Sequence, residues 1–222
     1  MKNVTLVIPA KFESESLPKV LHELKKFNVK KIIVLPKDDI LTIESIKKYN
    51  SKIIFQKKSG YGSALNEGIL SVKTKYFCIF NADGAFNPKY LKKMFSIINK
   101  KNDFVFNTRY EKNAGSDDDT FLTFIGNQFF TFICNILFNL NISDVLFTYV
   151  MGSTKAYKSL KVKSKDFSFC VELPIKAKLK KYKLATLPTH ERARIAGKKK
   201  VNEFKDGFLI LISVLRLFIF RK

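Results

Sequence analysis

The stretch Tyr76-Phe77-Cys78-Ile79-Phe80-Asn81-Ala82-Asp83-Gly84 passes from a continuous apolar run directly into a polar turn. A short apolar run without alternation is typical of a strand that is buried on both faces. A carboxylate just after such a strand lies at the edge of the sheet where α/β proteins bind ligands. This stretch therefore predicts a parallel sheet whose strands end in polar, ligand-binding side chains.

The same pattern of apolar strand and amphipathic helix repeats on both sides of this stretch. Strands are expected at residues 4–8, 32–35, 53–55, 76–80, 104–107 and 184–187. Helices are expected between them, from residues 17, 40, 64 and 88 onward. This order predicts an α/β fold with a Rossmann-like, mostly parallel central sheet and helices on both faces.

The second half of the chain is less regular. A Phe-rich helical stretch at residues 121–140, interrupted at Gly126-Asn127, is expected to pack on the sheet or to lie along lipid. A helix is expected at residues 171–179, and a basic loop at 190–200 precedes a last helix that begins near Asp206. Because no linker divides the sequence, we predict one domain over residues 1–222.

The composition points to an anionic partner. Lys and Arg number 41 and Asp and Glu 19, so the net charge is +22, which favours nucleic acid, a phospholipid surface or phosphorylated small molecules. The chain has no nucleic-acid recognition motif, and nucleic acid is not expected. Cys78, Cys134 and Cys170 are far apart in apolar runs, which is typical of reduced core cysteines in a cytosolic protein. With two histidines and no cysteine pair, zinc chemistry and Cys–His catalysis are excluded.

Asp83 allows two interpretations. A carboxylate at this position can hold a divalent metal, because Mg²⁺ needs only one or two carboxylates when substrate phosphates supply its other ligands. Alternatively, Asp83 forms an Asx turn that Gly84 closes. Gly60 and Gly62, which follow a pair of lysines, likewise form either a phosphate cradle or a flexible turn.

Three further charged positions have alternatives of the same kind. The basic cluster of Arg192, Arg194 and residues 198–200 either grips phosphate or forms a solvated face. Asp144 is a catalytic base, a group that orients the acceptor, or the cap of a helix end. Glu172 lies among apolar residues and needs a cationic partner, which a structural ion pair would also provide.

The C-terminal stretch at residues 207–222 is apolar nearly all round and ends in charge. It suits a helix lying at a membrane interface, where basic residues add attraction to anionic lipid. The alternative is a helix that closes the core. A spanning helix is not expected, because the apolar part is short and contains Arg216.

In order, these pieces resemble the family 2 glycosyltransferases, especially the dolichol- or polyprenyl-phosphate sugar synthases. The similar stretches are residues 7–18, Gly60-Tyr61-Gly62-Ser63-Ala64-Leu65-Asn66-Glu67-Gly68, Asn81-Ala82-Asp83, Thr108-Arg109-Tyr110, Ser143-Asp144, Glu172, residues 194–200 and Lys205-Asp206-Gly207. The likeness covers almost the whole chain, in order and at family-like spacing.

The resemblance implies a GT-A fold, a nucleotide-diphosphate sugar and a divalent metal, Mg²⁺ or Mn²⁺, held by Asp83. It divides the domain into a donor half at residues 1–110, an acceptor half at 111–206 and a membrane-interface helix at 207–222. It implies catalytic roles for Asp83 and Asp144. The substrate-binding residues that it implies are Pro9, Ala10, Glu13, Gly60, Gly62, Asn81, Arg109, Glu172, Arg194 and Lys200, with Arg109 and Arg194 facing phosphates.

The chain departs from the family pattern at two informative places. Asn81 replaces the first carboxylate of the aspartate motif, and residues 120–124 lack an arginine that the family has nearby. The function expected is a metal-dependent, inverting sugar transfer to a polyprenyl-phosphate or a cell-surface glycan. The protein is expected to be cytoplasmic and peripheral at the cytosolic face of the membrane. The alternatives are a non-catalytic nucleotide- or phosphate-binding module and a nucleic-acid-binding protein suggested by charge alone.

Overall fold

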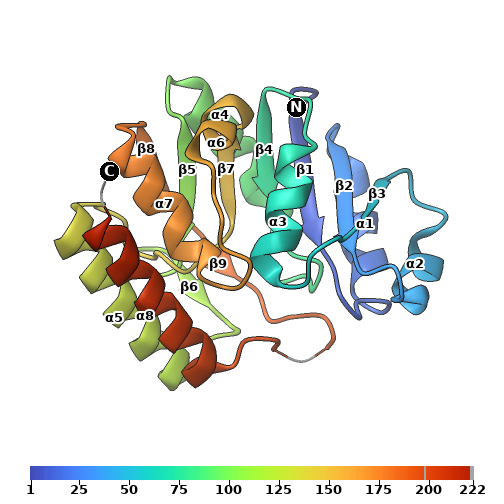
Figure 1. Cartoon of the computed structure of the whole chain (residues 1–222). Coiled ribbons are helices and arrows are strands. Elements are labelled where there is room, and N and C mark those ends of the chain that lie inside the picture. The colour runs from blue at the N-terminus through green and yellow to red at the C-terminus, as the bar shows by residue number, and fades with distance from the viewer. Residues whose placement is uncertain (198, 221–222) are drawn as a thin grey trace.

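The structure, a computed structural model, describes residues 1–197 and 199–220. A seven-stranded sheet in the order β3-β2-β1-β4-β7-β5-β8 forms its centre (Figure 1). The strands are β1 (Val4–Pro9), β2 (Lys30–Leu35), β3 (Lys52–Phe55), β4 (Tyr76–Ile79), β5 (Phe104–Thr108), β7 (Val150–Ser153) and β8 (Leu184–Pro188). A separate pair consists of β6 (Gly115–Ser116) and β9 (His190–Glu191).

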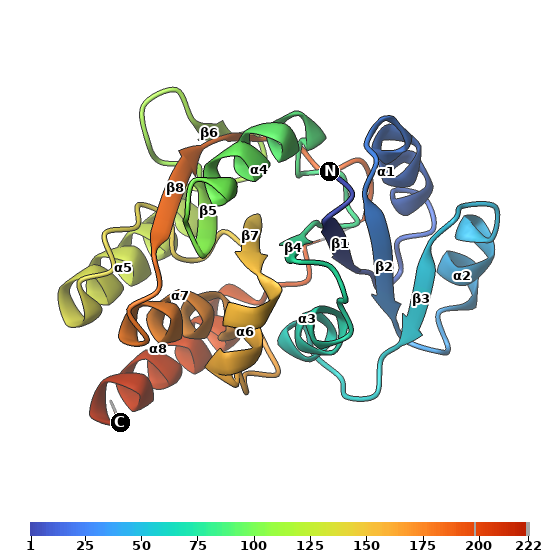
Figure 2. The same cartoon turned by 90° about the horizontal axis from the view of Figure 1, so that it is seen from above.

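Helices lie on both faces of this sheet, as the sequence predicts. They are α1 (Leu17–Glu23), α2 (Ile40–Ile46), α3 (Tyr61–Leu70), α4 (Leu91–Asn99), α5 (Phe121–Phe138), α6 (Thr154–Leu160), α7 (Phe169–Leu179) and α8 (Glu203–Ile219), with short 3-10 turns at η1 (Leu24–Lys26) and η2 (Pro88–Tyr90). The view from above separates α1 and α4 on one face from α3, α6 and α7 on the other (Figure 2). The mostly parallel sheet covered by helices confirms the predicted fold class.

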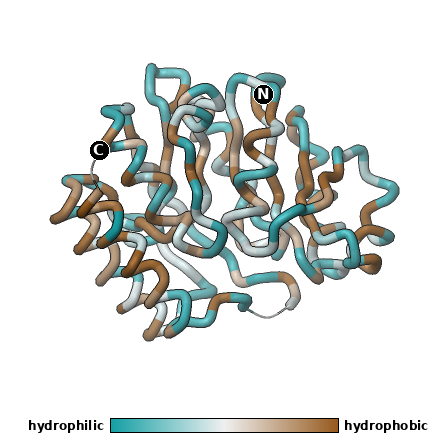
Figure 3. Tube along the Cα trace, viewed as in Figure 1, coloured by the Kyte–Doolittle hydropathy of each residue, from teal (hydrophilic) through white to brown (hydrophobic). Residues whose placement is uncertain are grey.

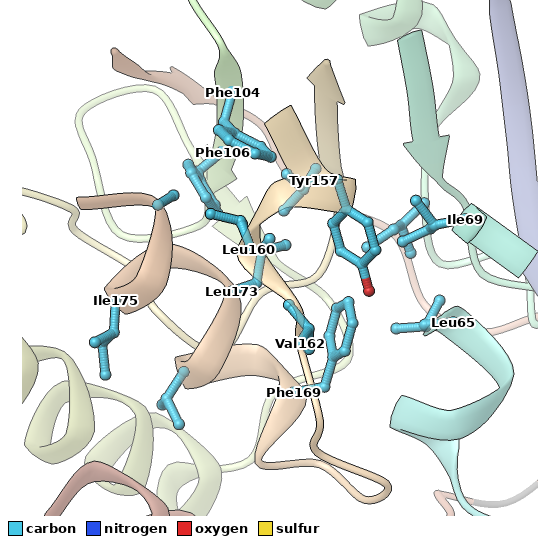
Figure 4. Close-up of a cluster of buried hydrophobic side chains, with 14 of the residues drawn as sticks. Leu65, Ile69, Phe104, Phe106, Tyr157, Leu160, Val162, Phe169, Leu173 and Ile175 are labelled. Atoms are coloured by element: carbon cyan, nitrogen blue, oxygen red, sulfur yellow. The ribbon is translucent and has the colours of Figure 1, made fainter. Parts of the chain in front are cut away.

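Each face of the sheet buries its own apolar cluster. On the α3–α6–α7 face, Leu65, Phe104, Tyr157 and Phe169 lie in one group (Figure 4). On the other face, the side chains of α1 and α4 pack against alternate residues of β1, β2 and β4. The three cysteines are buried and unpaired, as expected.

Strand β7 is antiparallel to both of its neighbours, and the sequence did not predict it. Met151 lies opposite Cys78 of β4 and Val105 of β5. Gly152 makes this possible, because a Cβ there would come within 2.7 Å of the rings of Phe77 and Phe104. The strand therefore fills the gap between the parallel strands β4 and β5.

Helix α5 also differs from the prediction, since it continues through Gly126-Asn127 without a break. Asn127 is buried and donates its side-chain amide to the hydroxyl oxygen of Tyr110 at 2.6 Å. A Cβ at Gly126 would meet nothing within 4 Å, so this glycine is not needed for a close approach of another segment. Within the described chain, α5 is the one helix that could cross a membrane by length and hydropathy alone.

Helices α5 and α8 lie side by side, and both are rich in hydrophobic residues, coloured brown along the tube in Figure 3. Together they expose a broad apolar area. We call this area the α5–α8 surface. Its exposed large apolar residues are Phe121, Leu122, Phe124, Ile125, Phe129, Phe132 and Ile136 on α5, and Phe204, Phe208, Ile212, Leu215, Phe218 and Ile219 on α8. The expected last helix is confirmed from Glu203, and Arg221 and Lys222 lie outside the described residues.

Candidate active site at the carboxyl edge of the sheet

Asp83 lies in a tight turn just beyond β4. Its Oδ1 accepts the backbone N–H of Ala85 at 3.0 Å, which is the Asx turn that was one of its two interpretations. Gly84 closes the turn with φ +88°, and a Cβ there would lie 2.4 Å from the Ile195 side chain. The turn uses Oδ1, and Oδ2 lies 3.9 Å from Arg194 Nη1, so Asp83 retains an oxygen that can bind a cation.

A basic segment lies along this turn. The backbone N–H of Arg192 donates to Ala85 O at 2.9 Å. The guanidinium of Arg192 binds both oxygens of Glu23, at 3.1 and 3.0 Å, and also the carbonyls of Gly84 and Phe86. Arg192 therefore fastens the segment to the Asp83 turn and has few donors left for a ligand.

Arg194 comes next and lies beside Asp83. Its Nη1 is 3.9 Å from Asp83 Oδ2, while its Nε and Nη2 bind Asp118 at 3.1 and 2.7 Å. The backbone N–H of Ile195 donates to the carbonyl of Asp83 at 2.7 Å, and this bond holds the backbone next to Arg194 against the Asp83 turn. Two residues that the sequence singled out separately, Asp83 and Arg194, are thus brought together.

Glu13 and Lys200 form a second charged pair at the same edge. The Lys200 ammonium binds the Glu13 carboxylate and the carbonyl of Lys11. Ser16 donates its hydroxyl to the other Glu13 oxygen at 2.5 Å, so Glu13 is held from both sides. The basic loop is thus attached to this edge of the sheet at both of its ends, at Arg192 and at Lys200. Lys198, within the loop, lies outside the described residues.

The surroundings of Asp83 favour a bound cation. Burial raises the pKa of the Asp83 carboxyl and the nearby charges of Glu13 and Asp118 raise it further, while the Ala85 N–H and Arg194 lower it. A desolvated carboxylate with other carboxylates nearby is stabilised by any cation that joins it. In the described chain, no three His, Cys, Asp or Glu side chains are grouped to hold a metal by themselves. The residues fit a Mg²⁺ or Mn²⁺ ion shared with substrate phosphates, which needs only one or two carboxylates.

Arg109 occupies a buried cluster of three carboxylates. Its Nε and Nη2 bind the two oxygens of Asp144 at 2.7 and 3.0 Å, and its Nη1 binds Asp119 and Glu191 at 3.2 and 3.1 Å. The side chain is 8% exposed and that of Asp144 is fully buried. Every guanidinium nitrogen of Arg109 is therefore bonded to a carboxylate of the protein. The phosphate contact that the family resemblance implies for Arg109 stays a prediction.

The cluster shifts the pKa values of its members. Burial alone lowers the pKa of Arg109, but Asp144 and Glu191 outweigh this and raise it well above its usual value. Burial raises the pKa of Asp144 and of Glu191, and Arg109 opposes the rise in both. One guanidinium thus neutralises part of the charge of three acidic groups.

The glycine turn ahead of α3 packs against another backbone segment. A Cβ at Gly60, where φ is +108°, would lie 2.1 Å from the carbonyl oxygen of Lys165. A Cβ at Gly62 would lie 2.7 Å from that of Ser164. The backbone N–H groups of the lysine pair before the turn donate to Glu67. These contacts favour the turn interpretation over the phosphate cradle.

Glu172 holds the segment against which the glycines pack. Its carboxylate accepts the backbone N–H groups of Lys163 and Ser164 and the ammonium of Lys176 at 2.5 Å. Burial would raise the pKa of Glu172, but the bonds from Lys176 and Ser164 lower it below the usual value. The structural ion pair, one of the two sequence interpretations, describes this contact.

Replacing Gly60 with alanine is expected to destabilise the fold by about 1–3 kcal/mol, because the positive φ and the Lys165 carbonyl both oppose a Cβ. Gly126→Ala is a matched control: its Cβ would meet nothing within 4 Å in mid-helix, so a gain approaching about 1 kcal/mol is expected. Urea denaturation of both variants measures the difference. Equal stabilities would contradict the close packing at Gly60.

Three predicted site residues remain: Pro9, Ala10 and Asn81. Pro9 ends β1, and the N–H of Ala10 donates to Val34 O at 2.9 Å. Asn81 accepts the Tyr61 hydroxyl at 3.2 Å, and that hydroxyl also contacts Thr148. Asn81 is thus part of the same edge as Asp83.

Comparison with known proteins agrees with this architecture. The family model described as Glycosyl transferase family 2 matches residues 5–161. The chain belongs to glycosyl transferase family 2. The predicted family is therefore confirmed, and with it the general transferase chemistry.

Several relatives of this glycosyltransferase are known by sequence. An uncharacterised glycosyltransferase of Mycobacterium tuberculosis is 24% identical over 211 residues, covering 94% of each chain. A dolichyl-phosphate hexose transferase of Haloferax volcanii is 24% identical over 190 residues, covering 84% of this chain and 80% of the relative.

Solved structures with the same fold include glucosyl-3-phosphoglycerate synthase from Mycobacterium tuberculosis. Its complex with Mn²⁺, uridine diphosphate and glucosyl-3-phosphoglycerate has a TM-score of 0.76 at 12% identity, covering 97% of this chain and 79% of that one. Its complex with Mg²⁺ and uridine diphosphate has a TM-score of 0.74 at 13% identity, with the same coverage. These likenesses establish the fold of this glycosyltransferase.

Three acidic residues of this edge were missed in the sequence: Asp118, Asp119 and Glu191. Asp118 pairs with Arg194, and the other two bind Arg109. The signal that was available is the run of three aspartates at residues 117–119, which is unusual in a chain of charge +22.

Proposed function

We propose that this glycosyltransferase moves a sugar from a nucleotide-diphosphate sugar to a polyprenyl-phosphate at the cytosolic face of a membrane. The observation that carries the proposal is the juxtaposition of Asp83 and Arg194, 3.9 Å apart at the carboxyl edge of the sheet. An anion-binding arginine beside a metal-binding carboxylate suits a diphosphate that binds to both. Glu13 and Lys200, which form a charged pair at the same edge, would border the nucleotide.

In this proposal Asp83 would hold Mg²⁺ or Mn²⁺ together with the donor's phosphates. The metal would stabilise the charge that develops on the leaving diphosphate, a large electrostatic contribution in such reactions. Arg194 would bind a phosphate oxygen from the side, and Asn81 would contribute a neutral oxygen next to Asp83. The attack on the sugar carbon would come from the acceptor side and invert its configuration.

The acceptor assignment rests partly on Asp144. A hydroxyl acceptor needs a base to take its proton, whereas a phosphate is already anionic. Asp144 is fully buried and both of its oxygens bind Arg109, so a substrate proton has no open route to it. We therefore propose that Asp144 positions Arg109 and that a phosphate acceptor is favoured over a glycan hydroxyl. The name of the Haloferax volcanii relative, a dolichyl-phosphate hexose transferase, points the same way.

The α5–α8 surface supports binding to a membrane. Thr131 accepts the Val145 N–H at 3.1 Å and Asn135 donates to Ile142 O at 2.8 Å, so α5 is attached to the protein body along one side. A helix held in this way suits lying flat in the lipid interface better than crossing the bilayer. The net charge of +22 would add attraction to anionic lipid.

A transfer assay tests the proposal. The full-length protein is incubated with Mn²⁺, labelled UDP-glucose or GDP-mannose, and vesicles that contain anionic lipid and polyprenyl-phosphate. Label is expected in the lipid fraction only when metal and polyprenyl-phosphate are both present, and less of it with neutral vesicles. Nucleotide binding without any transfer to lipid phosphate or to a glycan would instead support the non-catalytic module.

A further inference from the structure

Asp118 binds Arg194 in the geometry that an arginine uses for a phosphate. Its two oxygens accept from Nε and Nη2 at 3.1 and 2.7 Å, as a pair of parallel bonds. Arginine pairs carboxylates and phosphates with this same fork. The side chains of Asp118 and Arg194 are only 17% and 23% exposed, so the pair is largely shielded from water.

The loop that carries Asp118 is firmly held. The backbone N–H groups of Asp118 and Asp119 donate to Ser116 Oγ at 3.2 and 3.1 Å, and that hydroxyl donates to Glu191 at 2.6 Å. Strand β6 pairs with β9, which ends three residues before Arg194. The β6–β9 pair and the bonds of Ser116 therefore hold Asp118 next to Arg194 in the free protein.

Arg194 is already surrounded by negatively charged side chains. The guanidinium already faces Asp118, Asp83 and Glu13, each of which raises its pKa. A diphosphate bound at Asp83 would bring further negative charge next to Asp118. A phosphate that binds Arg194 through the parallel bonds of Nε and Nη2 would have to displace Asp118, because Asp118 holds these two nitrogens.

We infer that Asp118 is a positioning residue that occupies the phosphate-binding fork of Arg194 until a diphosphate displaces it. This inference rests on the function proposed above. In the free enzyme Asp118 holds Arg194 next to Asp83. After sugar transfer Asp118 binds Arg194 again, in place of the phosphate, and so promotes release of the nucleoside diphosphate. The affinity for diphosphates is thereby kept moderate, in favour of turnover.

Calorimetric titration with pyrophosphate and with UDP, in the presence of Mn²⁺, tests this role. Asp118→Asn keeps the side-chain shape but removes the charge and one of the two accepting oxygens, so about tenfold tighter binding is expected. Asp117→Asn is the matched control, since its neighbouring carboxylate is exposed and pairs with His190 instead; its affinity should match the wild type. The double variant Asp118→Asn, Arg194→Ala should bind no better than Arg194→Ala alone.

The outcomes separate the two proposals. If the wild type binds both probes and Asp118→Asn binds them equally or more weakly, the role of Asp118 is wrong and the transferase proposal stands. Weaker binding together with a loss of Mn²⁺ affinity would make Asp118 a metal ligand instead. If neither protein binds UDP or pyrophosphate with Mn²⁺, both proposals fail. Thermal unfolding of each variant checks that the fold is kept.

Discussion

Asp83→Asn is expected to slow sugar transfer roughly a hundredfold to a thousandfold, the usual effect of removing one group that stabilises developing charge. Asparagine can still accept the Ala85 N–H through its side-chain oxygen, so the Asx turn and the fold should remain. The missing negative charge should weaken Mn²⁺ binding in the presence of UDP. Steady-state rates and a Mn²⁺ titration measure the two effects separately.

Glu44→Gln serves as the control for this variant, because Glu44 is an exposed carboxylate on α2 that pairs with Lys47 at the end of the helix. Its rate and its metal affinity should equal those of the wild type. Since the pKa of Asp83 is raised by burial, protons compete with the metal, and the Mn²⁺ affinity of the wild type should fall as the pH is lowered. An Asp83→Asn protein with full activity would refute the metal site.

Arg109→Met is expected to destabilise the protein by about 3–5 kcal/mol, which is the usual cost of leaving buried charges without their partner. Methionine fills part of the volume but leaves Asp144, Asp119 and Glu191 facing one another. Arg109→Lys keeps one positive charge without the fork, so a smaller loss is expected. Urea denaturation of the three proteins gives the free energies of unfolding.

The destabilisation should depend on pH with a definite sign. The pKa values of Asp144 and Glu191 are already raised by burial, and removing Arg109 raises them further. A carboxyl with a higher pKa in the folded state binds its proton more tightly when folded, so its stabilisation is lost as the pH rises through that value. The deficit of Arg109→Met should thus be smaller at pH 5 than at pH 8. A deficit that is equal at both would show that the carboxylates do not respond to Arg109.

The parallel part of the sheet could be predicted because its strands are continuous apolar runs, such as Val4–Pro9, whose burial follows directly from their composition. Strand β7 could not. It has four residues and includes Gly152, which lowers strand propensity when seen in isolation. What makes it a strand is the space between the rings of Phe77 and Phe104, and neither residue is near it in sequence.

The candidate site, too, could be predicted only in part. Asp83, Glu13 and Arg194 could be placed together because each follows a strand or lies in a basic loop next to the same edge. The carboxylates that bind Arg109 and Arg194 could not be predicted. Asp118 and Asp119 lie in an irregular loop, where the sequence has no helical or strand periodicity that would indicate the direction of a side chain. When a carboxylate and an arginine meet only in the folded structure, the sequence separation between them gives no sign of the contact. The phosphate role expected for Arg109 remains a prediction.

The reversed strand β7 also has a consequence for biosynthesis. Until Ser153 has left the ribosome, β4 and β5 have no common neighbour, and each presents open hydrogen-bonding groups on the side where β7 will insert. The nascent chain must therefore reach Ser153 before β4 and β5 can be joined through β7, although its first strands and helices are already complete. Chaperone dependence during translation should be greatest over that interval and should fall once β7 has inserted between β4 and β5.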